Sequence, residues 1–274
     1  MIHLKTPEEI DMIARGGSII ADFLVEVPSR IVPGVSTLEI DSFADAFIRS
    51  HDGAVPAFKG LYGFAGSVCI SLNEEVVHGI PKADRILTDG DIVSIDVGVK
   101  LDGWCSDSAW TFPVGEMDEQ SRHLLTVTEE SLVAAISAVQ VDDHVGDVGA
   151  AVMVCVEGTG LHIIRDLVGH GVGREVHEEP QVSNLGSPGT GPLLREGMVI
   201  AIEPMLAWGT DGIRTLDDRW TVVTQDGTRS AHFEHTVAVT ANGPRILTRG
   251  PAACSDRSLG RDVGLNTAKT PGIP

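Results

Sequence analysis

The feature that most constrains how this 274-residue chain can fold is a repeated pair of motifs. Residues 90–96 read Gly-Asp-Ile-Val-Ser-Ile-Asp, a glycine followed by an apolar strand and a terminal acid, and residues 197–203 read Gly-Met-Val-Ile-Ala-Ile-Glu. A His-x-x-Pro motif precedes each segment, at His78 and at His177. Motifs that recur in the same order indicate two copies of one structural unit. We therefore expect one domain over residues 1–249, built from related halves at about 1–115 and 116–249.

Helix and strand signals recur in the same order in both halves. Thr6 and Ser36 each stand three residues before a glutamate, a capping-box pattern that predicts helices over 7–27 and 36–50. Amphipathic segments predict two further helices, over 120–139 and 145–157. Short β-rich segments predict strands over 67–72, 91–97, 161–168, 198–202, 220–224 and 235–239. Two helices followed by strands, occurring twice, indicate an α+β fold.

The composition excludes several classes of protein. A formal net charge of −19 argues against a nucleic-acid partner, because neutralising phosphates requires a basic surface. The four cysteines stand far apart without a C-x-x-C motif, which excludes a zinc finger and favours a reducing compartment. No apolar run approaches the ~20 residues that span a bilayer. We therefore expect no membrane partner and a cytoplasmic location, and we expect residues 250–274, which lack periodicity, to form a disordered tail.

Asp96 and Asp107 are the first candidates for a functional site. Asp96 ends an apolar strand, and the Asp102-Gly103 dipeptide that follows is a strong signal for a tight hairpin turn. A turn there places Asp96 opposite Ala109, so that Asp107 projects diagonally from the same face as Asp96. Two neighbouring carboxylates repel each other unless a cation lies between them. The alternative is that both acids are solvated strand residues.

Three more residues carry groups that bind metals. Glu203 ends the equivalent strand of the second half, Glu234 precedes another apolar strand, and His170 lies in Gly-His-Gly-Val-Gly. A phosphate-binding loop is the alternative for those glycines, although their spacing is not G-x-G-x-x-G. Four carboxylates and one imidazole favour Mn, Fe, Co or Zn in a cluster of two ions. Two such ions can clamp the attacking oxygen and the carbonyl oxygen of a substrate.

His78 and His177, one from each half, are candidates for donors that stabilise a developing oxyanion, and the alternative for each is a structural role. At this point the sequence resembles the type I methionine aminopeptidases. Seven motifs carry the resemblance, in the family's order and between about residues 6 and 248. They are His78-Gly-Ile-Pro, Ser94-Ile-Asp-Val, Cys105-Ser-Asp, Gly169-His-Gly-Val-Gly, His177-Glu-Glu-Pro, Ile202-Glu-Pro-Met and Phe233-Glu-His-Thr.

The resemblance implies the pita-bread fold, in which two α+β halves with antiparallel sheet, related by a pseudo-two-fold axis, enclose a dinuclear metal site. It implies two divalent ions, Co, Mn, Fe or Zn, with five ligands from this chain. Asp107 and Glu234 match the ligands that bridge both ions. Asp96 matches a ligand of one ion, and His170 and Glu203 match ligands of the other.

The resemblance also implies catalytic and substrate-binding roles. A metal-bound hydroxide attacks the scissile carbonyl, and Glu203 matches the residue that moves a proton from bound water to the leaving amine. His177 matches the group that polarises this carbonyl, and His78 matches one that contacts a backbone nitrogen of the substrate. Both histidines and four further residues match the substrate site, the four being Leu61, Phe64, Cys69 and Trp220. The chain departs from many bacterial relatives, which often have Cys, Tyr, Tyr and Phe, at Phe58, Leu61, Phe64 and Val176.

The activity that the resemblance implies is removal of the initiator methionine from nascent polypeptides whose second residue is small and uncharged. The expected partner is the nascent chain at the ribosome, and the expected oligomeric state is a monomer. One alternative is an Xaa-Pro peptidase of the same fold, which usually carries an extra N-terminal domain. The other is a binding protein with an inactive site, although such proteins have lost ligands and all five are present here.

Overall fold

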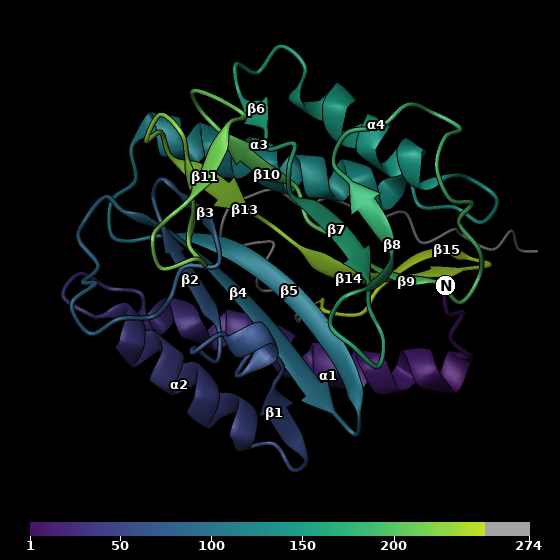
Figure 1. Cartoon of the computed structure of the whole chain (residues 1–274), viewed down its shortest axis with the longest axis horizontal. Helices are drawn as coiled ribbons and strands as arrows, with labels where there is room; N and C mark the ends of the chain where they lie inside the picture. The colour runs from purple at the N-terminus through teal and green to yellow at the C-terminus, as the bar shows by residue number, and fades with distance from the viewer. Residues whose placement is uncertain (250–274) are drawn as a thin grey trace, which may run out of the picture.

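A computed structural model describes residues 1–249 of the chain, and the predicted tail at 250–274 lies outside these residues. Helices occupy two opposite sides of the molecule, with the strands between them (Figure 1). The helices are α1 (Pro7–Glu26), α2 (Thr37–Arg49), α3 (Glu119–Ser137) and α4 (Val145–Val156), with 3₁₀ turns η1 (Val27–Arg30) and η2 (Leu61–Gly63). These bounds confirm the four predicted helices to within a few residues.

Both predicted capping boxes form. The Thr6 hydroxyl accepts from the backbone of Glu9, whose carboxylate accepts from the backbone of Thr6, and Ser36 and Glu39 repeat this pair at α2. Such caps satisfy backbone N–H groups that have no partner in the first turn of a helix. The two N-terminal helices therefore begin where the sequence predicts.

The first half is built on a sheet in which every pairing is antiparallel. Its strands are β1 (Ala54–Pro56), β2 (Cys69–Leu72), β4 (Ile92–Leu101) and β5 (Trp104–Pro113). Strand β4 pairs with β1, β2 and β5. The buried face of this sheet packs on α1 and α2 through an apolar cluster that includes Ile20, Phe23, Ile40, Ile48 and Val97.

The second half repeats this arrangement with a five-stranded antiparallel sheet in the order β15-β14-β9-β7-β8. Its strands are β7 (Val168–Gly171), β8 (Glu178–Ser183), β9 (Val199–Ile202), β14 (His235–Thr240) and β15 (Gly243–Ile246). Its core packs against α3 and α4 through a second cluster that includes Leu124, Leu132, Val152, Ile200 and Val237. A third cluster, which includes Ile13, Trp104, Val172 and Ala201, joins the two halves.

Two small antiparallel sheets complete the fold. They are β13-β10-β6 and β11-β12-β3, from β3 (Glu75–Val77), β6 (His162–Ile163), β10 (Met205–Ala207), β11 (Ile213–Thr215), β12 (Val222–Thr224) and β13 (Ser230–His232). Because β3 of the first half pairs with β12 of the second, the halves share a sheet. Within residues 1–249, no helix is both long enough and apolar enough to cross a bilayer.

One strand prediction is wrong. The segment 161–168 is not a continuous strand, because β6 ends at Ile163 and β7 begins only at Val168. The two pieces belong to different sheets, since β6 pairs with β10 and β7 pairs with β8 and β9. Between them the chain bends at Arg165 and Asp166, and Arg165 forms an exposed ion pair with Asp211. Arg165 and Asp166 therefore mark the point at which the chain passes from one sheet to the other.

Candidate metal centre

The β4–β5 hairpin positions the two acids of the first half. Asp102 and Gly103 both have positive φ, as a tight two-residue hairpin turn requires. The register places Asp96 opposite Ala109 and Gly98 opposite Asp107, which confirms the pairing predicted from the turn. Asp96 and Asp107 therefore lie diagonally on one face of the hairpin. Asp107 is only 3% exposed.

Three residues of the second half approach this hairpin. His170 lies on β7, Glu203 directly follows β9, and Glu234 directly precedes β14. Because His235 pairs with Ile202, the carboxylates of Glu203 and Glu234 lie at the same end of the sheet. Of these three residues, Glu203 belongs to the repeated strand–acid motif, at residues 197–203.

Hydrogen bonds between the halves hold two of the acids together. The backbone N–H of Glu234 donates to the carbonyl of Ala109 at 2.8 Å. The Thr236 hydroxyl donates to the Asp107 carbonyl at 2.7 Å, and the Asp107 N–H donates to the same hydroxyl at 3.0 Å. The Ser108 hydroxyl donates to the Glu234 carbonyl at 2.5 Å. These buried bonds fix the backbone on both sides of the site.

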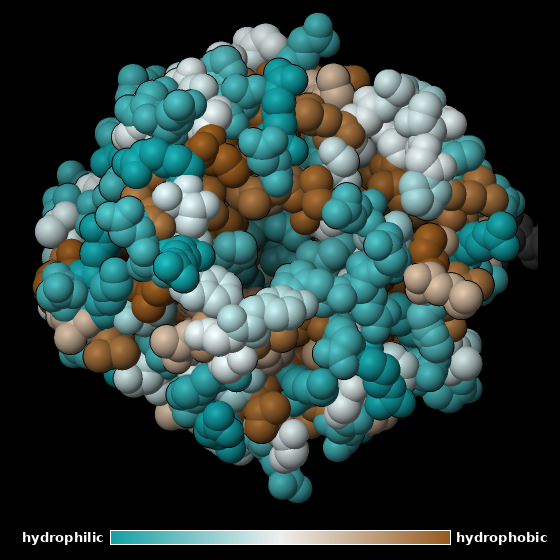
Figure 2. Space-filling view, viewed as in Figure 1, coloured by the Kyte–Doolittle hydropathy of each residue, from teal (hydrophilic) through white to brown (hydrophobic). Residues whose placement is uncertain are grey.

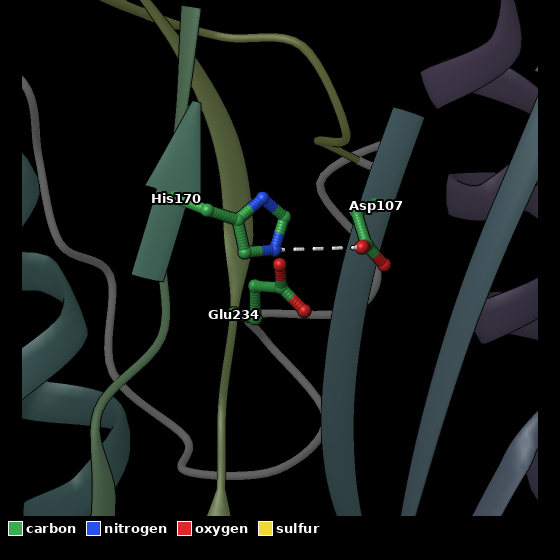
Figure 3. Close-up of side chains that lie close together, drawn as sticks. All are labelled: Asp107, His170 and Glu234. Atoms are coloured by element: carbon green, nitrogen blue, oxygen red, sulfur yellow. Dashed lines mark ion pairs between the residues drawn. The ribbon is translucent and has the colours of Figure 1, made fainter. Parts of the chain in front are cut away.

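The side chains converge on a small volume. Ligand atoms of Asp107, His170 and Glu234 all lie within 4.8 Å of one another, and Figure 3 shows the three groups pointing toward a common space. His170 Nε2 lies 3.9 Å from Asp107 Oδ2 and 3.5 Å from Glu203 Oε1. The other ring nitrogen, Nδ1, lies 2.9 Å from the Gly171 carbonyl. Donation to that carbonyl places the proton on Nδ1 and leaves the Nε2 lone pair facing the carboxylates.

The electrostatics of the site fit a divalent metal. Asp96 Oδ1, Asp107 Oδ1 and Glu234 Oε1 are buried without a hydrogen-bond partner. Burial raises the pKa of Asp96 and that of Glu203 to about 7. Burial, together with the charges of neighbouring acids, raises the pKa of Asp107 and that of Glu234 well above the ordinary range. Buried carboxylates without partners are costly, and a cation among them reverses that cost.

A cavity of about 270 Å³ adjoins these groups. It is lined by Asp96, Asp107, His170, Glu203 and Glu234, and by residues of both halves that are apolar or carry imidazoles. Figure 2 shows a hollow near the centre of this face, with hydrophilic residues at its bottom. Every residue that the sequence predicts to bind substrate lines the cavity, namely Leu61, Phe64, Cys69, His78, His177 and Trp220.

Two uncharged imidazoles flank the cavity. Burial, and then the charge of His232, lowers the pKa of His78 to about 4. Burial, and then His78, lowers the pKa of His177. The His177 ring lies 4.5 Å from that of His170, centroid to centroid. His78 lies edge-on to Trp220, with centroids 6.4 Å apart. A neutral imidazole can donate one hydrogen bond, which suits recognition of a carbonyl oxygen or an amide.

A buried ion pair anchors the loop that carries His177. Lys5 Nζ lies 2.8 Å from Glu178 Oε2, and the Lys5 side chain is 1% exposed. The other carboxylate oxygen accepts from the backbone N–H groups of Arg174 and Glu175 at 2.7 and 3.3 Å. Although burial acts in the opposite direction, the hydrogen bond and charge of Lys5 lower the pKa of Glu178. The N-terminal segment thereby fixes the residue next to His177.

Tyr62 and His232 are among the residues of the cavity that the sequence analysis does not predict. Tyr62 is 77% exposed, has a φ of 50° and stacks against His177. His232 is 2% exposed, and its Nε2 is buried without a hydrogen-bond partner. The signal for His232 is its place two residues before Glu234, because residues two apart face the same way in an extended chain. For Tyr62 the flanking glycines give only a turn signal.

Comparisons with known proteins agree with this geometry. The model of metallopeptidase family M24 matches residues 11–241. The chain is 50% identical over 248 residues to a methionine aminopeptidase of Clostridium perfringens, a match that covers 90% of this chain and 99% of the relative. It is 48% identical over 249 residues to methionine aminopeptidase 1 of Bacillus subtilis, covering 91% of this chain and all of the relative.

Solved structures share the fold. A crystal structure of methionine aminopeptidase from Thermotoga maritima has a TM-score of 0.89 and 45% identity, covering 91% of this chain and 100% of that one. A prolidase from Pyrococcus furiosus has a TM-score of 0.73 at 24% identity, covering 90% of this chain and 66% of that one, and so shows the fold alone. These likenesses confirm the predicted pita-bread fold, and the chain belongs to metallopeptidase family M24, among the methionine aminopeptidases.

Proposed function

We propose that this chain is a metal-dependent aminopeptidase that removes the N-terminal methionine of polypeptides whose second residue is small and uncharged. The observation that carries the proposal is that four carboxylates and the His170 imidazole line one largely apolar cavity. Asp107 and Glu234 are buried there, and Asp96 and Glu203 are half-buried. Relatives of nearly the same length, at 50% and 48% identity, are named methionine aminopeptidases, which supports the same substrate here.

The proposed ligands of two divalent ions, Co, Mn, Fe or Zn, are Asp96, Asp107, His170, Glu203 and Glu234. The partnerless oxygens of Asp96, Asp107 and Glu234 support this assignment, as does the free lone pair of His170 Nε2. When bound, divalent ions polarise a carbonyl oxygen and make water more acidic, which is the chemistry that peptide hydrolysis requires. Carboxylate and imidazole ligands suit each of these four metals.

We assign three residues to catalysis. Glu203 lines the cavity with one carboxylate oxygen 3.5 Å from His170 Nε2, and a carboxylate there can accept a proton from water and pass it to a leaving amine. In this proposal His177 donates to the scissile carbonyl, where an N–H donor stabilises developing negative charge. His78, which lines the same cavity, contacts the substrate backbone.

The cavity walls support selection of methionine. Phe64 packs edge-on against Trp220 with ring centroids 5.1 Å apart, and Leu61 and Cys69 complete this apolar wall. A flexible thioether fills such irregular apolar space well and makes favourable contacts with aromatic rings. A charged first residue would lose its hydration in this wall without gaining a partner.

The proposed setting is the cytoplasm, where the enzyme acts as a monomer on nascent chains at the ribosome. Within residues 1–249, the three cysteines Cys69, Cys105 and Cys155 form no disulfide with one another, which supports a reducing compartment. We further propose that residues 1–249 are one catalytic domain, because each half supplies ligands and neither holds the site alone.

The test is a peptide panel with purified protein that has been stripped of metal by a chelator. We expect cleavage of Met-Gly-Met after addition of Co²⁺ or Mn²⁺, little cleavage of Ala-Gly-Met, and no activity before metal is added. Asp96→Ala should abolish cleavage, whereas Asp22→Ala, which removes an exposed acid from α1, should not change it. Preference for peptides with proline in second place would instead identify an Xaa-Pro peptidase, and undiminished activity of Asp96→Ala would contradict the ligand assignment.

A further inference from the structure

A buried histidine that has no role among the proposed ligands faces the metal centre. His232 is the last residue of β13, and its side chain is 2% exposed. Its backbone is fixed on both sides, since its N–H donates to the Thr111 hydroxyl and that hydroxyl donates to its carbonyl, each at 2.9 Å. Its register partner on β10 is Met205. The backbone is therefore held, while the ring nitrogen Nε2 has no hydrogen-bond partner.

The ring of His232 faces Glu203. His232 Nε2 lies 3.5 Å from Glu203 Oε2, while the other carboxylate oxygen, Oε1, lies 3.5 Å from His170 Nε2. The Glu203 carboxylate thus lies between two imidazoles, one on each oxygen. Its backbone carbonyl also accepts from the side-chain amide of Asn184 at 3.0 Å. Each oxygen of the Glu203 carboxylate therefore faces one ring nitrogen.

Coordination of a metal by His232 is the competing role, and the experiment below distinguishes the two. Within residues 1–249, the ligand atoms that lie within 4.8 Å of one another belong to Asp107, His170 and Glu234, a set that leaves out His232 and also the proposed ligands Asp96 and Glu203. The contact that the structure gives to His232 Nε2 is the one with Glu203 Oε2. Carboxylates that bind a metal commonly accept a hydrogen bond from a neighbouring residue that does not itself bind the metal.

We propose that His232 is a positioning residue that donates from Nε2–H to Glu203 Oε2 and so directs Glu203 Oε1 toward the metal centre. The proposal rests on the proposed function, because it acts through Glu203. A separation of 3.5 Å exceeds the usual 2.7–3.2 Å of an N–H···O bond, and a small rotation of the carboxylate closes it. The buried Nε2 then gains the partner that it lacks.

Two substitutions of His232 distinguish a hydrogen-bond donor from a side chain that only fills space. His232→Gln places an amide nitrogen where Nε2 lies and keeps the donor, whereas His232→Leu keeps an apolar body and removes the donor. We expect His232→Leu to bind Mn²⁺ about 10–100-fold more weakly and to lose kcat by a similar factor, with the KM for Met-Gly-Met changed less than about threefold. His232→Gln should recover most of both losses.

The measurements are calorimetric Mn²⁺ titration, steady-state kinetics, and the visible absorption of the Co²⁺-loaded protein. His123→Leu serves as the matched control, because His123 lies on α3 and bonds the Thr159 carbonyl, away from the cavity. Wild-type affinity and kcat in His232→Leu would overturn the proposal. A His232→Gln variant as impaired as His232→Leu, with a changed Co²⁺ spectrum, would overturn it in favour of direct coordination. Because metal affinity is measured without substrate, failure of wild-type protein to cleave Met-Gly-Met would refute the proposed function separately.

Discussion

At the scale of single residues, the site brings together buried carboxylates that repel one another unless a cation lies between them. Asp107 and Glu234 are 3% and 2% exposed, and each has an oxygen without a hydrogen-bond partner. Burial, and the charges of the other acids, raise the pKa of both. The metal-free protein must bury these charges or take up protons, and both cost free energy. As proposed metal ligands, these residues would serve function at the expense of stability.

Asp107→Asn tests this trade-off, because it removes the charge and keeps the shape. At pH 7.5 the unfolded chain has Asp107 ionised, so the metal-free native state loses a burial cost when asparagine replaces it. We expect the free energy of unfolding in chelator to rise by about 1–3 kcal/mol. The increase in Tm on adding Mn²⁺ should shrink strongly, and cleavage of Met-Gly-Met should be lost. Urea unfolding with and without metal measures both effects, and an unchanged response to Mn²⁺ would rule out Asp107 as a ligand.

At the scale of elements, local chemistry explains where most helices and strands begin and end. Capping boxes start α1 and α2, and the Asp102-Gly103 turn sets the register of β4 and β5. The third helix, α3, carries a carboxyl group in an environment that disfavours its charged form. Glu129 is half-buried there, and burial, followed by the charge of Glu130, raises its pKa to about 7.

Glu129→Gln should therefore stabilise the protein at alkaline pH. A carboxyl whose pKa is raised by folding gives stability that is present below its unfolded pKa, near 4.5, and is lost as pH rises through about 7. We expect the variant to be more stable than wild type by about 1–2 kcal/mol at pH 8, with the difference vanishing near pH 4.5. Glu130→Gln, the exposed neighbour, should change stability by less than about 0.5 kcal/mol. Urea unfolding at both pH values decides, and a difference independent of pH would contradict the explanation.

At the scale of the whole molecule, the site depends on how the two halves meet. Hydrogen bonds from Ser108 and Thr236 join β5 to the backbone around β14. On the other side of that junction, α1 packs against the C-terminal end of the described chain. A Cβ at Gly17 would lie 2.1 Å from the Leu247 carbonyl oxygen, which is backbone and cannot move away cheaply.

Gly17→Ala should loosen this contact. Overpacking between rigid backbones typically costs about 1–3 kcal/mol, which outweighs the better helix propensity of alanine. We expect a lower Tm and weaker Mn²⁺ binding, since the proposed ligands come from both halves. Ser18→Ala, at the exposed next position of α1, is the matched control and should stay within about 0.5 kcal/mol of wild type. Thermal unfolding measures the change in Tm, and calorimetry measures the change in Mn²⁺ affinity. Wild-type values of both for Gly17→Ala would contradict a need for close contact between α1 and the Leu247 backbone.

The amino-acid sequence by itself determined the local features and the chemistry. Residue pattern was sufficient for the α+β organisation, both capping boxes, the β4–β5 register and the diagonal placement of Asp96 and Asp107, because these depend on neighbours in the chain or on a two-residue turn. The motifs also indicated the family, which the relatives confirm.

Only the tertiary structure decided what depends on contacts between distant segments. Segment 161–168 is divided because its two ends join different sheets, and periodicity does not report which partner a strand finds. The ion pair of Lys5 with Glu178 and the approach of His232 to Glu203 join residues from separate elements. Local pattern cannot specify such pairs, because the distance between their side chains is set by the packing of the two halves.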